Sequence, residues 1–237
     1  MSKRLAVLLL LFGLCVLCGA QTAIINVVDK STVENCPVRL SGKIEMTESE
    51  VNGVNQTSFA SHVSTTNLSN SPIVAMVTDT RIANSVGPLV GENHQLDAFF
   101  AHDLEIAPGQ TYTHDHSDTG KFSTPVSKQA AKKVPAASSQ VIFVQFADGQ
   151  ICGDIQDARV LSLMATRADL LTALKRIDDA SQKGDTEFLK ALAEKASDRT
   201  GHAGGILDHI RDMQKQKGST VALEYIRSML AVAASRS

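Results

Sequence analysis

The chain has 237 residues, of which 43% are hydrophobic and 20% charged, and its formal net charge is −2. This balance is typical of globular protein and argues against a nucleic-acid partner, because phosphate binding needs a concentrated basic surface. Aromatic residues make up 4% of the chain and tryptophan is absent, so the chain has few side chains on which bases or sugars could stack.

The first twenty residues have the pattern of a signal peptide. Lys3 and Arg4 form a short basic segment, Leu5 to Leu17 is apolar but too short to span a bilayer with ease, and small residues precede Gln21. We therefore predict a signal peptide over residues 1–20, cleaved after Ala20. The mature chain, with no transmembrane span, would be secreted or periplasmic.

Residues 21–154 have the pattern of a β-sandwich domain. Short β-prone runs alternate with turn sequences such as Asn52-Gly53, Pro108-Gly109 and Asp148-Gly149, without helical periodicity between them, which indicates a sandwich or small barrel. Gln140–Ala147 has apolar residues on both faces, which predicts a strand in the middle of a sheet. The expected strands are 38–46, 58–64, 73–79, 96–106, 111–116 and 140–147.

Three segments of this half resemble bacterial exported immunoglobulin-like sandwiches, a group of unknown function. They are Asn67-Leu-Ser-Asn-Ser-Pro-Ile73, Leu104-Glu-Ile-Ala-Pro-Gly-Gln110 and Phe143-Val-Gln-Phe-Ala-Asp-Gly149. In such domains a strand with a polar turn pairs with one that ends in a Pro-Gly turn. The resemblance implies an immunoglobulin-like antiparallel β-sandwich and no particular activity, and it covers the β-half only.

Cys36 and Cys152 are the two cysteines outside the predicted signal peptide, and they bracket the β-half. In an exported protein such a pair predicts a disulfide, which would pin both ends of the domain together. The alternative is two buried free thiols.

After about Ile155 the apolar periodicity changes from two to 3.6, so we predict a helical domain over 155–237. Gly184 and Gly218 are the expected helix ends, and Asp185 and Ser219 the expected N-caps. The similarity of Lys183–Leu189 to Lys217–Leu223 is consistent with a duplicated helical hairpin and equally with chance likeness between two amphipathic hairpins. We expect the helices to form a compact unit of four, because two hairpins fall short of the three units that a free-standing repeat array needs. The expected helices are 157–182, 186–198, 203–217 and 219–234, which gives an α+β fold class.

His114 and His116 are the strongest candidates for chemistry. On a strand the two rings point to one face, at a spacing that lets both reach one metal ion, with His94, His102 or Asp118 as further ligands. The alternative, which we expect, is a polar strand end with both rings exposed and no third group closing on them.

Other patterns carry no catalytic assignment. His202 lies in a glycine-rich turn and His209 on a solvated helix face, and neither has the partners of a known motif. We therefore expect no catalytic or cofactor-binding residues, and a non-enzymatic exported protein that binds another protein or a cell-envelope component. The alternative is a metal-binding module or metal-dependent enzyme that uses His114 and His116 with a divalent transition metal.

Overall fold

The computed structural model describes residues 21–33, 35–51, 54–84, 87–118, 136–194 and 202–236. In these residues eight strands are followed by four α-helices, so the predicted α+β class is confirmed. The predicted signal peptide lies outside the described residues. None of the described helices is both long and apolar enough to cross a membrane.

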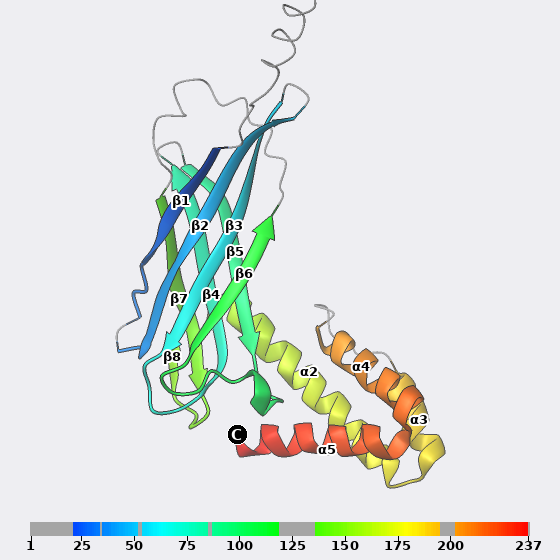
Figure 1. Cartoon of the computed structure of the whole chain (residues 1–237). Coiled ribbons are helices and arrows are strands. Elements are labelled where there is room, and N and C mark those ends of the chain that lie inside the picture. The colour runs from blue at the N-terminus through cyan, green and yellow to red at the C-terminus, as the bar shows by residue number, and fades with distance from the viewer. Residues whose placement is uncertain are drawn as a thin grey trace, which may run out of the picture.

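The strands form one nearly closed sheet, with the path β5-β4-β7-β1-β2-β3-β6 and β8 paired to β7 (Figure 1). A short 3₁₀ helix, η1 (His102–Leu104), lies between β5 and β6. The strands are β1 (Gln21–Asp29), β2 (Val38–Val51), β3 (Val54–Asn67), β4 (Ile73–Asn84), β5 (Gly87–Asp97), β6 (Thr111–Asp118), β7 (Ala136–Phe146) and β8 (Ile151–Gly153).

The sheet is mixed because β1 changes partner along its length. Its residues 21–26 pair antiparallel with β2, and its residues 27–29 pair parallel with β7. The other paired strands are antiparallel. The expectation of a wholly antiparallel domain is therefore wrong at this one strand, which joins two antiparallel groups into a continuous path.

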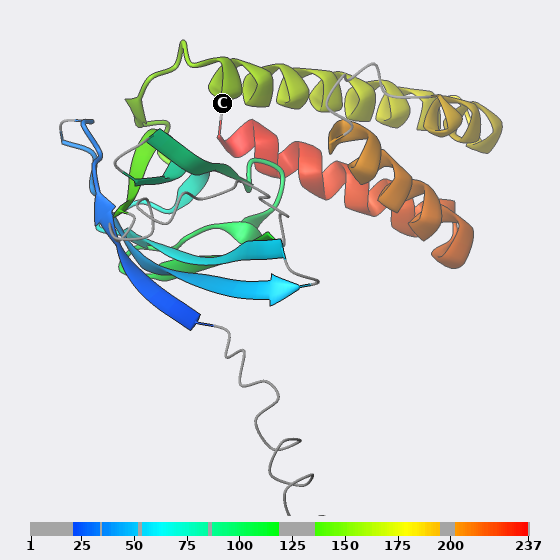
Figure 2. The same ribbon diagram turned by 90° about the horizontal axis from the view of Figure 1, so that it is seen from above.

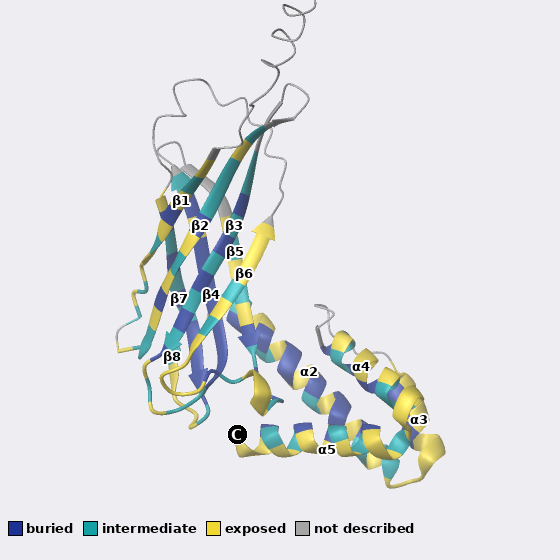
Figure 3. Cartoon of the chain, viewed as in Figure 1, coloured by how far each residue is buried: buried dark blue, intermediate teal, exposed yellow. Residues whose placement is uncertain are grey.

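β7 lies in the middle of the path and is buried on both faces, as predicted for Gln140–Ala147. Its inner face contacts a core that includes Leu40 and Met76. On its outer face Phe143 packs against Val160 and Leu163 of the first long helix. Figure 3 shows the buried residues of β4 and β7 and the buried stripe of that helix.

The four helices lie beside the sheet and share a core of their own (Figure 2). The N-terminal half of α2 covers β4 and β7, and its C-terminal half packs with the other helices through Leu170, Leu174 and Ile177. The helices are α2 (Ala158–Ser181), α3 (Asp185–Ala193), α4 (His202–Lys217) and α5 (Ser219–Ser235).

Gly184 and Gly218 follow the ends of α2 and α4, as predicted, and their N–H groups donate to Ser181 and Gln214 of those helices. The predicted N-caps, Asp185 and Ser219, are wrong by one residue. Gly184 and Gly218 are the N-caps of α3 and α5, with φ of 114° and 91°, and Asp185 and Ser219 are the first residues inside those helices. Only glycine adopts such a backbone without strain, so each tight connection between neighbouring helices needs its glycine.

The predicted strand over 96–106 is wrong. β5 ends at Asp97, and the chain then turns so that Phe100 enters the core of the helices. The sequence prediction also did not include β1 and most of β5. In β5 the inward positions include the polar residues Glu92 and His94, which break the apolar alternation expected of a strand.

Cys36 and Cys152 are joined in a disulfide, with Cα atoms 5.7 Å apart, as the sequence predicted. Both cysteines pack against the core cluster that contains Leu40 and Phe146. The bond links the segment before β2 to β8, at one end of the sheet.

Candidate metal centre

The candidate site lies where the two terminal strands of the sheet path, β5 and β6, face each other. In the described residues these strands are joined by side chains and not by a backbone ladder. Alternate residues of a strand point to the same face, so Glu92 and His94 share the inward face with buried Leu96. On β6 the same alternation places His114 and His116 together.

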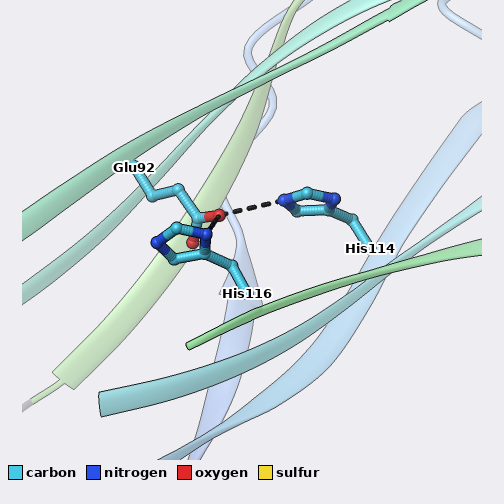
Figure 4. Close-up of side chains that lie close together, drawn as sticks. All are labelled: Glu92, His114 and His116. Atoms are coloured by element: carbon cyan, nitrogen blue, oxygen red, sulfur yellow. Dashed lines mark hydrogen bonds and ion pairs between the residues drawn. The ribbon is translucent and has the colours of Figure 1, made fainter. Parts of the chain in front are cut away.

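Glu92 lies between the two imidazole rings (Figure 4). Its Oε1 is 3.0 Å from Nε2 of His114 and 3.7 Å from Nδ1 of His116. One ligand atom from each of the three residues falls within 4.8 Å of the other two. Side-chain exposure is 17% for Glu92, 27% for His114 and 50% for His116, so the cluster is sheltered on one side and open on the other.

Ser61 of β3 fixes the second oxygen of this carboxylate. Its Oγ donates a hydrogen bond of 2.7 Å to Oε2 of Glu92, and the serine is buried. The bond orients the carboxylate and leaves Oε1 directed at the histidines. Second partners of this kind commonly orient metal ligands.

His94 belongs to the same group of rings but not to the ligand set. Its ring stacks on His114 with centroids 3.6 Å apart, and on Tyr112 at 5.7 Å. Burial, together with the charge of His114, lowers the pKa of His94 to about 4. The imidazole is therefore neutral near pH 7, and its Nε2 is buried without a hydrogen-bond partner among the described residues.

A small cavity of about 70 Å³ opens beside the cluster. Glu92 and His116 form one side of it, and Ile44, Phe59 and Ile82 form an apolar wall. The hydroxyl residues Ser61 and Thr80 also line it. The curved sheet thus encloses one carboxylate and two imidazoles beside a cavity that has both hydroxyl and apolar side chains in its walls.

The structure contradicts the expectation that no third group closes on His114 and His116. His116 is exposed, but His114 is about three-quarters buried, and Glu92 approaches both rings. The sequence did hold a signal for Glu92, since it lies two and four residues before His94 and Leu96 on one strand face. Because the predicted strand begins at Leu96, the prediction does not place Glu92 on a strand and does not include it in the site.

The other histidines considered lie elsewhere. His102 pairs with Glu105 at 2.6 Å near the C-terminus of α5, and His209 is exposed on α4 beside Tyr225. Asp118 ends β6 and His202 begins α4, and both side chains are outside the described part of the structure. Of the residues proposed to complete the site, His94 comes close to it and His102 does not.

No family model matches this chain, and neither a curated protein nor a solved structure is similar to it.

Proposed function

We propose that this chain is an exported binding protein that holds a divalent transition metal between Glu92, His114 and His116. The observation that carries the proposal is the position of one carboxylate oxygen against both imidazoles, contributed by two strands far apart in the sheet path. Imidazole nitrogen with carboxylate oxygen is a donor set that suits Zn²⁺, Fe²⁺ and Cu²⁺.

The distances support this assignment. Bonds of about 2.0–2.2 Å to a tetrahedral ion place the ligand atoms about 3.3–3.6 Å from one another. The two separations from Glu92, 3.0 and 3.7 Å, bracket that range. A ligand nitrogen of His114 and one of His116 also lie within 4.8 Å of each other, so an ion would draw the two rings closer while Ser61 holds the carboxylate in place.

The disulfide supports export, because such bonds persist in oxidising compartments. We retain the immunoglobulin-like resemblance as part of the proposal, supported by the two antiparallel strand groups that β1 connects. A protein or cell-envelope partner stays a prediction from the sequence.

Metal analysis of the purified protein tests the proposal. After chelation, titration with Zn²⁺ is expected to give one equivalent bound, and His114→Ala with His116→Ala should abolish it. His62→Ala is the matched control, because His62 also pairs with a carboxylate, Asp115 at 2.7 Å, but on the exposed face of the neighbouring strand. Zinc binding that is absent from the native protein, or equally reduced by the control, contradicts the proposal.

A further inference from the structure

The three-residue set leaves the proposed ion short of ligands. Structural zinc sites are closed by four protein ligands, whereas sites with three keep a position for water or another exogenous ligand. His94 does not supply the fourth ligand, because its ring is stacked face to face on His114 and is outside the group of converging atoms. Among the described residues, then, the ion would retain at least one open position.

The cavity indicates where such a position points. Two of the three ligand residues, Glu92 and His116, form one side of it. Its volume of about 70 Å³ compares with the roughly 30 Å³ that one water occupies in the liquid, so it has room for two or three non-hydrogen atoms. Larger ligands would meet the apolar wall.

The chemistry of the walls favours a compact anion held by the metal. Ile44 and Ile82 are buried and cannot solvate a charge, so the ion itself must supply the attraction. Thr80 also lines the cavity, and its hydroxyl forms a 2.9 Å hydrogen bond with Ser139. The cavity therefore has the positive charge of the ion at one end and apolar side chains at the other, which suits a short linear anion.

We propose that the metal held by Glu92, His114 and His116 keeps an open coordination position toward this cavity and binds a small anion of two or three non-hydrogen atoms there. The inference rests on the proposed function and adds the class of ligand.

The test uses the full mature chain loaded with Co²⁺, whose visible absorption reports the coordination of the ion. Co²⁺ alone is titrated first, and azide is then added to the loaded protein. Azide should change the spectrum saturably, whereas pivalate, a bulky anion, should bind about tenfold more weakly or not at all. Because this comparison uses the unsubstituted protein, its result does not depend on whether a variant folds.

A pair of variants locates the anion. Ile82→Phe fills the cavity and should weaken azide binding by about tenfold while Co²⁺ still binds. Ile24→Phe is the control, because the same replacement falls on an outward position of β1 that is 63% exposed. It should leave both affinities unchanged.

The outcomes separate the two proposals. If Co²⁺ does not bind, the metal site itself is wrong. If Co²⁺ binds but azide leaves the spectrum unchanged, or azide and pivalate bind equally, the metal site stands and the open position toward the cavity is wrong.

Discussion

Arg167 of α2 and Asp97 of β5 form a two-point ion pair at the junction of the helices and the sheet. Nε and Nη2 of Arg167 lie 3.0 and 2.8 Å from Oδ1 of Asp97, and its Nη1 donates to Gln145 over 2.6 Å. The guanidinium also lies 4.5 Å from the ring centroid of Phe99. Because Asp97 ends the strand that carries Glu92, the helices are tied to the strand that supplies the candidate site.

Replacing Arg167 with Ala should lower the free energy of unfolding by about 3–5 kcal/mol. The two side chains are 6% and 10% exposed, so the change leaves a carboxylate buried without its partner. Urea unfolding followed by circular dichroism measures the effect. Arg227→Ala is the control, since the Arg227 side chain is 53% exposed and its pair with Asp178 should contribute under about 1 kcal/mol. Equal losses in the two variants contradict the prediction.

Metal binding should raise thermal stability in a way that depends on Glu92. A ligand that binds only the folded state at 100 times its Kd adds about 2.7 kcal/mol. We expect Zn²⁺ to increase Tm in the native protein and to have little effect on Glu92→Gln, which keeps the size of the side chain but loses its charge. Differential scanning calorimetry with and without zinc measures this, and an undiminished shift in the variant argues against Glu92 as a ligand.

His94→Phe should leave the apoprotein as stable as before or stabilise it by about 1–3 kcal/mol. The replacement keeps a ring stacked on His114 and removes a buried nitrogen that lacks a hydrogen-bond partner in the described structure. His94→Ala, which removes the ring as well, should instead destabilise the fold. Urea midpoints of the two variants are the measurement, and a loss for Phe as large as that for Ala would show that the nitrogen has a stabilising partner.

Asp157 caps α2 and should make stability depend on acid pH. Its carboxylate accepts hydrogen bonds from the side chain and the backbone N–H of Arg159, which lower its pKa from 3.8 to about 2. Its contribution is therefore complete above about pH 4 and is lost as the pH falls through about 2. Asp157→Ala should cost about 1 kcal/mol at neutral pH and flatten the acid limb of the stability curve.

Asp157→Asn is the control for this effect, because the amide oxygen still caps the helix but has no charge to titrate. It should retain most of the neutral-pH stability and lose the acid dependence. An acid limb unchanged in both variants means that other carboxylates control it.

Loss of the disulfide should destabilise the protein by about 2–5 kcal/mol, because the bond closes a long loop in the unfolded chain. The cysteines are 116 residues apart. The Cys36→Ser, Cys152→Ser double variant and the reduced native protein should give similar urea midpoints below that of the oxidised protein. A reductant that leaves the native midpoint unchanged would overturn the pairing.

Local patterns were sufficient to predict much of this fold. The change in apolar periodicity near residue 155 separates strands from helices, and β8 ends at Gly153 while α2 begins at Ala158. The disulfide was predicted because two cysteines lie outside the predicted signal peptide. Apolar residues on both faces of β7 predicted its central place. Each of these features depends on neighbouring residues or on residue identity, which a sequence displays directly.

The third member of the candidate site depended on the folded sheet. Glu92 and His114 lie on strands that do not pair with each other, and they meet because the whole path of strands curves until its two ends face one another. The partner change within β1 and the turn of Phe100 into the helical core also depend on how distant segments pack together. Such contacts follow from the summed twist and pairing of all the strands and from the packing of the helices against them, and no single segment of the sequence encodes that sum.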